Sequence, residues 1–240
     1  MPSKRSESGD KTGILAASGR ARQTAAGAHR PSGLYAISSE TRDDDALAGW
    51  AEAVLSGGAV WLQYRDKGRD PARRLAQARR LLAACRRHGA RLIVNDDVAL
   101  ARAIDADGVH LGRDDGDLAT ARAALGAGAL IGVSCYADLA RAQRLAAQGA
   151  DYLAFGAFHA SPTKPAAGVA GVGLLAAARP LGLPLVAIGG ITPDNGGALV
   201  RAGADLLAVV SGLAFPPALA AAAARRYADL FAPPPGIPPQ

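Results

Sequence analysis

Between residues 33 and 231, short apolar runs rich in β-branched residues alternate with longer stretches of Ala, Leu and Arg. Short apolar runs bounded by turn residues are typical of buried strands, and the longer stretches carry apolar residues at the spacing of a helix face. The pattern predicts eight strands, each followed by a helix. The strands are expected at residues 34–38, 59–65, 91–95, 108–112, 130–135, 151–156, 184–190 and 206–212.

Eight strand–helix units in about 200 residues match a single (β/α)8 TIM barrel, an α/β fold. The alternative is an open doubly wound sheet, which favours a glycine-rich G-x-G-x-x-G turn after its first strand. The segment after the first predicted strand reads SETRDDD and holds no glycine, so the barrel is favoured. Gly89, Gly149 and Gly203 follow predicted helices, where glycine adopts the left-handed C-cap conformation at little cost.

The two ends of the chain lack this pattern. Residues 1–32 form a polar leader. We expect it to be disordered or to result from a translation start placed too far upstream, and an organellar transit peptide is the alternative. Residues 232–240 are rich in proline, which excludes a helix and predicts an extended tail. One domain is therefore predicted over residues 33–231.

Composition narrows the partners and the compartment. The net charge is +6, but the leader holds six basic residues against two acidic ones, and no basic stretch interleaves with aromatic residues. Nucleic-acid binding is therefore not expected. Cys85 and Cys135 are too few and too far apart for a disulfide framework, which favours a reducing compartment. No apolar run reaches the ~18 residues of a membrane span, and no secretory signal is present, so we expect a cytoplasmic protein.

Polar side chains gather at one end of the predicted barrel. In this fold the active site lies at the C-terminal ends of the strands, and those ends carry cations, carboxylates, hydroxyls and paired glycines. The residues concerned are Gln63, Arg65, Lys67, Asn95, Asp96, Arg113, Asp114, Asp115, Ser134, Gly189, Gly190, Ser211 and Gly212, with the loop FHASPTKP at 158–165. The strand starts carry no such set, so we expect the site at this mouth.

Gln63, Arg65 and Lys67 stand at alternate positions at the end of the second predicted strand. In an extended chain this spacing turns all three side chains to one face. If that face is the barrel interior, the two cations need an anionic partner, because unpaired buried charge is costly. A phosphate or diphosphate is the natural partner, and a solvated edge is the alternative.

Gly190 and Ser211 stand at the ends of the seventh and eighth predicted strands. In TIM barrels these loops often hold a phosphate with backbone N–H groups. Thr192 and Pro193 suit the N-cap and first position of a helix, so a plain tight turn is the alternative. Two anion sites beside carboxylates suggest Mg2+, which prefers oxygen ligands and substrate phosphates.

Six carboxylates lie between residues 95 and 115, and their positions separate them. Asp96 follows the third predicted strand, and Asp114 and Asp115 follow the fourth. Two neighbouring strands can therefore offer one ligand each to a single metal ion. Asp97, and Asp114 if Asp115 is the ligand, are expected to face solvent or cap the following helices, and Asp105 and Asp107 are expected to lie in turns.

Six motifs in order along the chain resemble one known family. They read QYRDK, VNDDVALARAIDADGVHLGRDD, IGVSC, DYLAFGAFHASPTKP, AIGGITPDN and AVVSGL. Together they make residues 33–215 similar to the thiamine phosphate synthases, also called thiamine-phosphate pyrophosphorylases. The resemblance implies a transferase in which 4-amino-2-methyl-5-hydroxymethylpyrimidine diphosphate loses pyrophosphate. The nitrogen of 4-methyl-5-(2-phosphooxyethyl)thiazole then attacks the methylene carbon, and thiamine phosphate forms.

The resemblance also implies roles for individual residues and a Mg2+ cofactor. The residues implied for the pyrimidine diphosphate are Gln63, Arg65, Lys67, Asn95, Ser134 and Lys164. Those implied for the thiazole phosphate are Ser161, Thr163, Gly190, Val210 and Ser211. Mg2+ is implied at Asp96 and Asp115, and the spacing from Gly112 also favours Asp115 over Asp114.

Catalysis in this family would be electrostatic. The departing pyrophosphate develops negative charge, which Mg2+ and the expected catalytic residues Arg65, Lys67, Ser134 and Lys164 would stabilise. The attacking nitrogen has no proton to lose, so no general base is required. The implied partners are the two small-molecule substrates, and a homo-oligomer stays open.

The chain departs from the family pattern at three positions. Ser161 replaces a Thr and keeps the hydroxyl, and Arg113 replaces a Gln and adds a cation near the metal. His159 stands where the family often has an aromatic or apolar residue, and we expect a plain loop residue rather than a proton carrier. His110, in mid-strand, and Cys135 are expected to be structural.

Two other functions compete with the synthase. A thiazole tautomerase-like isomerase shares the barrel but does not need the full diphosphate and metal set. A non-catalytic barrel that senses a phosphate ligand is the second. Both predict that no thiamine phosphate forms from the paired substrates, which makes that assay decisive.

Overall fold

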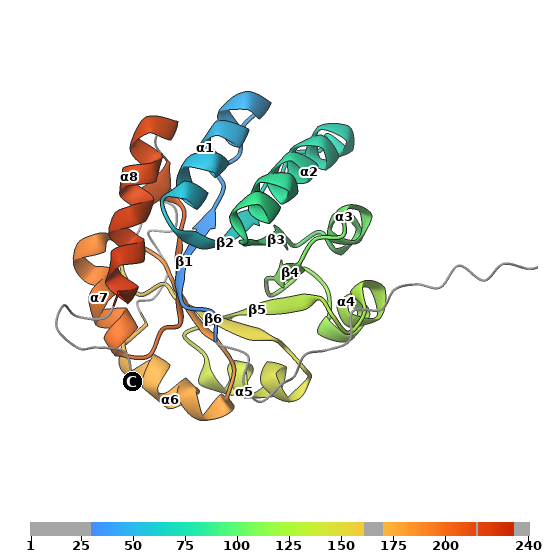
Figure 1. The fold of residues 1–240 in the computed structure, drawn as a ribbon. Coiled ribbons are helices and arrows are strands. Elements are labelled where there is room, and N and C mark those ends of the chain that lie inside the picture. Colours follow the sequence, from blue (N-terminus) through green and yellow to red (C-terminus); the bar gives the residue numbers. More distant parts are fainter. Residues whose placement is uncertain (1–29, 161–169, 215, 233–240) are drawn as a thin grey trace, which may run out of the picture.

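The computed structural model describes residues 30–160, 170–214 and 216–232. In this part of the chain, eight parallel strands close into a barrel in the order β1 to β8, and β8 pairs with β1. Helices surround the barrel (Figure 1). The predicted (β/α)8 fold is confirmed, and the open-sheet alternative is wrong because the two edge strands pair with each other.

The observed strands overlap every predicted strand. They are β1 (Gly33–Ile37), β2 (Ala59–Tyr64), β3 (Arg91–Asn95), β4 (Gly108–Leu111), β5 (Leu130–Tyr136), β6 (Tyr152–Phe155), β7 (Leu185–Ile188) and β8 (Leu206–Val209). The predictions for β7 and β8 extend too far at the C-terminal end, because their last apolar and glycine residues belong to the loops that form the mouth.

Each strand is followed by a helix within the described residues. The helices are α1 (Asp44–Ser56), α2 (Pro71–His88), α3 (Val98–Ile104), α4 (Leu118–Leu125), α5 (Leu139–Ala147), α6 (Gly173–Ala178), α7 (Pro193–Arg201) and α8 (Pro217–Ala228), with short 3-10 turns η1 (Arg179–Leu181), η2 (Ser211–Leu213) and η3 (Asp229–Phe231). Asp97 caps α3 by accepting from the backbone N–H of Leu100. Thr192 forms the predicted cap of α7, and Gly89 ends α2 in the left-handed conformation.

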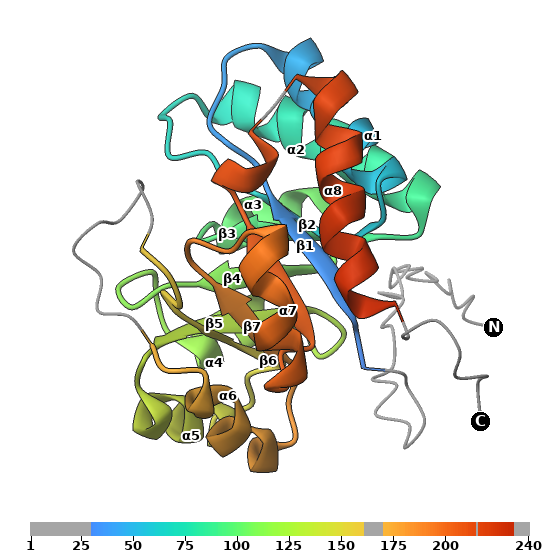
Figure 2. The same cartoon turned by 90° about the vertical axis from the view of Figure 1, so that its left-hand side faces the viewer.

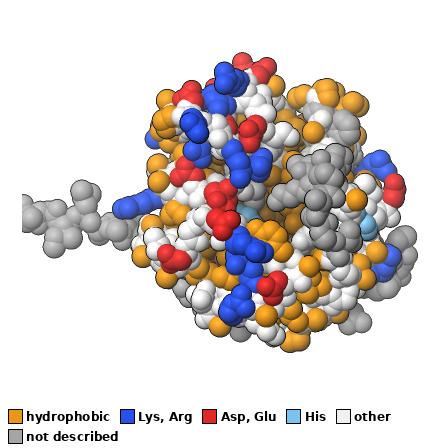
Figure 3. Space-filling model, turned by 180° about the vertical axis from the view of Figure 1, so that it is seen from behind, with side chains coloured by type: hydrophobic (Ala, Val, Ile, Leu, Met, Phe, Trp, Pro, Cys, Tyr) orange, Lys and Arg blue, Asp and Glu red, His pale blue; other side chains and the backbone are white. Residues whose placement is uncertain are grey.

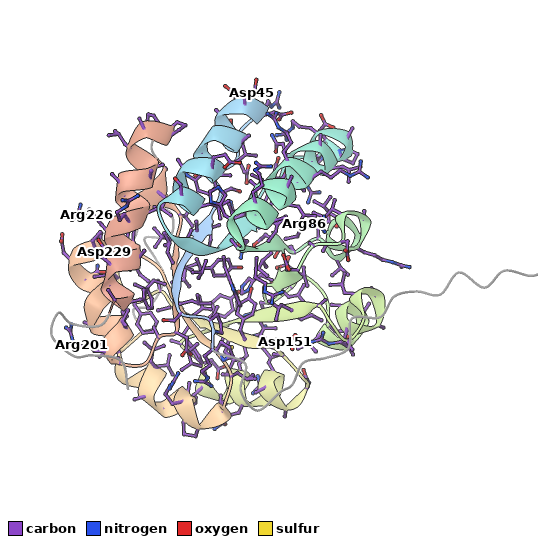
Figure 4. All side chains as sticks on the ribbon, viewed as in Figure 1. Asp45, Arg86, Asp151, Arg201, Arg226 and Asp229 are labelled. Atoms are coloured by element: carbon purple, nitrogen blue, oxygen red, sulfur yellow. The ribbon has the colours of Figure 1, made fainter. Side chains whose placement is uncertain are left out.

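Alternation along each strand separates two apolar layers. One set of side chains packs between strands and helices, and includes Leu62, Val94 and Cys135. The other set fills the barrel interior: Tyr35, Ile37, Trp61, Ile93, Tyr152, Ala154, Val186, Leu206 and Ala208. Figure 4 shows side chains throughout the centre of the barrel, while Asp45 on α1 points outward. The predicted packing role of Cys135 is confirmed.

Three aspartates fasten neighbouring strands at the end of the barrel opposite the mouth. Each precedes a strand and accepts a hydrogen bond, 2.7 to 2.9 Å long, from a backbone N–H near the start of the preceding strand. The pairs are Asp107 with Leu92, Asp151 with Ile131, and Asp205 with Leu185. Each aspartate also forms an ion pair with an arginine, and Figure 4 shows Asp151 near α4, which carries its partner Arg122. The sequence predicts only a turn residue at Asp107, and these three carboxylate staples were missed.

The first and last helices close the ring. Helices α1 and α8 lie side by side in both ribbon views (Figures 1 and 2). The indole N–H of Trp50 in α1 donates to the carbonyl of Leu213, 2.8 Å away, just before α8. None of the described helices is long and apolar enough to span a membrane.

Candidate active site

A cavity of about 550 Å³ opens at the C-terminal ends of the strands. Its lining includes all the predicted site residues that the structure describes: Gln63, Arg65, Lys67, Asn95, Asp96, Asp115, Ser134, Gly190, Val210 and Ser211. The lining also includes Arg113 and Asp114. Ser161, Thr163 and Lys164 lie outside the described residues. The structure thus brings the expected cations, carboxylates and hydroxyls to one mouth.

Arg65 and Lys67 follow the end of β2 and both line the cavity, as the alternating pattern predicts. The guanidinium of Arg65 lies 3.3 Å from the carboxylate of Glu40 in the β1–α1 loop. The backbone N–H of Arg65 donates to the hydroxyl of Ser38 at 2.9 Å. Both contacts hold the β1–α1 loop, which contains Ser38 and Glu40, against the β2–α2 loop, which begins at Arg65.

Asp66, between the two cations, points away from the cavity and is buried. Its carboxylate accepts from the backbone N–H of Gly68 at 2.6 Å and forms an ion pair of 3.0 Å with Arg73 of α2. The Tyr64 hydroxyl lies 3.3 Å from the same carboxylate. The buried carboxylate of Asp66 therefore holds the loop that carries Arg65 and Lys67 against α2.

Asp96 and Asp115 approach each other from the ends of β3 and β4. The amide of Asn95 donates to Asp96 at 2.5 Å, and the Asp115 carboxylate accepts from the backbone N–H of Gly112 at 3.0 Å. Burial, and then hydrogen bonding and repulsion from Asp115, raise the pKa of Asp96 to about 6. Two carboxylates this close are relieved by a shared cation, so the pair fits a divalent metal ion.

The donor set also fits Mg2+ in kind. No group of three or more His, Cys, Asp or Glu side chains in the described residues could hold a metal alone. Mg2+ is commonly held by one or two carboxylates and completed by water and substrate phosphate oxygens. Asp96 and Asp115 offer that incomplete set at the wall of the cavity.

Arg113 adds a cation to the rim of the cavity. Its guanidinium carbon lies 4.7 Å from the centre of the Tyr136 ring, a distance typical of a cation–π contact. Both residues line the cavity. The departure from Gln at this position therefore places a ring-supported positive charge beside Asp114 and Asp115, close to the predicted metal ligands.

The β7–α7 turn brings backbone to the cavity wall. A side chain at Gly190 would lie 2.5 Å from the carbonyl oxygen of Ala160, and the backbone at Gly190 has a φ of 62°. Only glycine fits both conditions. The amide of Asn195 in α7 donates to the Gly190 carbonyl at 3.0 Å, so this close approach is fixed by the cap of the next helix.

Several cavity residues were not predicted. Tyr35, Ile37 and Tyr136 line the cavity although none stands among the polar strand ends. His110, predicted to be only structural, lies in mid-strand as expected, but its ring lines the cavity and Nε2 lies 2.9 Å from the Ser134 hydroxyl. Its position in β4, in register with the inward side chains, is the signal that would have found it.

Comparison with known proteins identifies the family of the chain. A family model described as thiamine monophosphate synthase matches residues 34–213. The chain belongs to the thiamine monophosphate synthase family. It is 54% identical over 202 residues to the thiamine-phosphate synthase of Chromobacterium violaceum, and the aligned residues make up 84% of this chain and 97% of that protein. It is 55% identical over 197 residues to that of Thiobacillus denitrificans, over 81% and 92% of the two chains.

A solved structure of the family has the same fold. The thiamine phosphate pyrophosphorylase of Pyrococcus furiosus superposes with a TM-score of 0.71 at 30% identity, over 83% of this chain and 95% of that one. Thiamine monophosphate synthases are transferases, and the barrel with its polar mouth is that of a transferase of this family. On the face seen in Figure 3, acidic and basic side chains are interspersed.

Proposed function

We propose that the cavity joins 4-amino-2-methyl-5-hydroxymethylpyrimidine diphosphate to 4-methyl-5-(2-phosphooxyethyl)thiazole and releases thiamine phosphate and pyrophosphate. One observation carries the proposal: Arg65, Lys67, Asp96 and Asp115, which follow the neighbouring strands β2, β3 and β4, line one cavity together with Ser134 of the next strand, β5. A diphosphate is the group that needs both cations and carboxylates, because the carboxylates can serve it only through a metal ion.

The cationic side chains stabilise the leaving group. As the bond to the methylene carbon breaks, negative charge grows on the pyrophosphate, and Arg65 and Lys67 lie where they can bind it. Preorganised charge of this kind lowers the barrier without reorganisation during the reaction. Lys164 is proposed to add a third cation. The anchored loop around Asp66 keeps the first two in place.

Mg2+, held by Asp96 and Asp115, would neutralise diphosphate charge and act as a Lewis acid. Asn95 donates to Asp96 and so orients one of the two proposed ligands. Gln63 and Ser134 line the same cavity and are proposed to contact the pyrimidine part of this substrate, in addition to the catalytic role expected of Ser134.

The thiazole phosphate is proposed to bind at the opposite wall. Gly190, Val210 and Ser211 line the cavity there, and Ser161 and Thr163 are proposed to complete this site. Gly189 and Gly190 both line the cavity, and backbone N–H groups of such a turn are proposed to bind the phosphate. The thiazole nitrogen then attacks the methylene carbon and needs no base. We also propose that the enzyme works in the cytoplasm on these small molecules.

The test combines purified protein with both substrates and Mg2+, and measures thiamine phosphate and pyrophosphate together. The expected result is equal amounts of both products, with no turnover when Mg2+ is removed by chelation. Folded protein that makes neither product would overturn the proposal. A tautomerase-like isomerase would change the thiazole alone, and a ligand-binding barrel would bind phosphate compounds without any conversion.

A further inference from the structure

Two proposed pyrimidine-binding residues are joined across the barrel by hydrogen bonds. Gln63 on β2 donates from Nε2 to the Tyr35 hydroxyl at 2.8 Å. The Tyr35 hydroxyl lies 3.1 Å from the Tyr152 hydroxyl, which lies 3.0 Å from Nδ1 of His110. Nε2 of His110 lies 2.9 Å from Oγ of Ser134 on β5. The chain of contacts therefore runs from β2 to β5 through β1, β6 and β4.

The first hydrogen bond runs from Gln63 to Tyr35, and the remaining contacts can continue from it in one consistent direction. Because Gln63 donates to Tyr35, the single hydroxyl proton of Tyr35 is free to donate to Tyr152, whose proton then goes to Nδ1 of His110. A neutral imidazole that accepts at Nδ1 carries its proton at Nε2. In this direction His110 donates to Ser134, and the Ser134 hydroxyl proton is left for the cavity. At the other end, the amide oxygen of Gln63 is left to accept.

The middle of this chain of contacts is buried and packed between aromatic rings. Tyr152 is fully buried and does not line the cavity, whereas Tyr35 and His110 do. The Tyr152 ring packs edge-on against Trp61, with ring centres 5.0 Å apart. Burial raises the pKa of both tyrosines, so both hydroxyls keep their protons near pH 7. Tyr152 can reach a substrate only through its two neighbours.

We infer that Tyr152, His110 and Tyr35 form a hydrogen-bond relay that couples Gln63 to Ser134 and fixes which end presents a donor to the substrate. The inference rests on the proposed function and extends it to specificity. An aminopyrimidine offers an amino donor beside ring nitrogens that accept, and a 4-oxo ring reverses part of that pattern. A site with one fixed donor and one fixed acceptor distinguishes the two rings, because a mismatch leaves buried polar groups unpaired. The three relay residues are positioning residues.

Tyr152→Phe breaks the relay and leaves both ends in place. The expected result is an increase of about tenfold in the KM for the pyrimidine diphosphate, in line with one lost hydrogen-bonding arrangement. The KM for the thiazole phosphate stays the same, and discrimination against the 4-oxo analogue of the pyrimidine diphosphate falls. Tyr35→Phe, which breaks an adjoining link, gives the same pattern and replaces Tyr152→Phe if that variant does not fold.

Tyr227→Phe is the matched control. Tyr227 in α8 is buried, and its hydroxyl donates to the carbonyl of Ile191 at 3.0 Å, so this variant also loses one buried hydroxyl but lies outside the relay. Its KM for the pyrimidine diphosphate is expected to match that of the unmodified chain. If Tyr152→Phe behaves like this control and keeps full discrimination, Tyr152 serves packing alone and the relay is overturned.

A second measurement does not depend on activity. The chain has four histidines, so 15N spectra of histidine-labelled protein resolve the tautomer of His110, with His110→Asn to assign its signals. Near neutral pH we expect a single Nε2–H tautomer, and a mixture in Tyr152→Phe. An Nδ1–H tautomer or a protonated ring in the unmodified chain would refute the relay direction. A protein that makes no product would overturn the proposed function, and the tautomer would still decide the relay.

Discussion

The ammonium of Lys67 lies 3.9 Å from the carboxylate of Asp96 across the mouth of the barrel. This contact joins a proposed diphosphate-binding cation to a proposed metal ligand. Without a metal ion, Lys67 supplies part of the positive charge that the Asp96 and Asp115 pair lacks. A bound Mg2+ would take over that role and free the ammonium for the diphosphate, so metal and substrate are expected to bind together.

Mg2+ is therefore expected to stabilise the fold through the carboxylate pair. Binding to the native state raises the melting temperature by mass action, and inorganic pyrophosphate can supply the missing oxygen ligands. We expect a rise with Mg2+ and pyrophosphate in the unmodified chain, and none in Asp96→Asn or Asp115→Asn. Thermal denaturation measures it. Asp114→Asn is the matched control, and loss of the rise in Asp114→Asn but not in Asp115→Asn would reassign the second ligand.

Asp66 is expected to matter for both stability and substrate binding. Its ion pair with Arg73 is buried, with side chains 3% and 17% exposed, and removing one partner of a buried pair costs about 3–5 kcal/mol. Asp66→Ala should lower the free energy of unfolding by about 3 kcal/mol and raise the KM for the pyrimidine diphosphate, because the Arg65 and Lys67 loop loses its anchor. Urea denaturation and steady-state kinetics measure the two effects.

The exposed pair of Arg80 and Asp45 provides the comparison for Asp66. The Arg80 guanidinium lies 2.7 Å from the Asp45 carboxylate, and the two side chains are 45% and 91% exposed. Surface ion pairs contribute about 0–1 kcal/mol to stability. Asp45→Ala should leave the KM unchanged and barely move the unfolding midpoint. Equal effects of Asp66→Ala and Asp45→Ala would mean that the buried carboxylate anchors nothing.

Gly132 is expected to tolerate no side chain. A Cβ at this position would lie 1.8 Å from the Tyr152 ring, and overpacking of a core costs about 1–3 kcal/mol. Gly132→Ala should therefore destabilise the barrel and displace the ring, which circular dichroism in the near ultraviolet would detect. Gly171→Ala is the control, because no atom lies within 4 Å of a Cβ there. A Gly132→Ala variant as stable as this control would contradict the packing described.

The two thiols are expected to resist modification in the native protein. Cys85 and Cys135 are buried and unpaired with each other, and burial raises the pKa of each to about 12. Because the thiolate is the reactive form, a disulfide reagent at pH 8 should label neither until the chain unfolds in denaturant, when both react. Fast labelling of either thiol in native protein would show that the packing between the strands and the helices opens locally.

The sequence predicts the parts of the site that depend on one strand at a time. Gln63, Arg65 and Lys67 follow from alternation at a strand end, and Asp96 and Asp115 from their places after neighbouring strands. The relay does not follow in this way, because Tyr35, Tyr152 and His110 come from three strands that meet only when the barrel closes. Residue spacing gives the direction of each side chain, but closure of the barrel decides which side chains face one another.

The carboxylate staples Asp107, Asp151 and Asp205 join β3 to β4, β5 to β6 and β7 to β8. Six of the eight strands are thus fastened in three successive pairs, and the connections through α2, α4 and α6 run between pairs. Chimaeras that exchange segments with relatives at α2 or α6 keep each of these aspartates with its backbone partner and its arginine, and a crossover in α4 does so if it precedes Arg122. Crossovers at α3, α5 or α7 would separate an aspartate from its backbone partner, so the pairs mark the natural units for recombining this barrel.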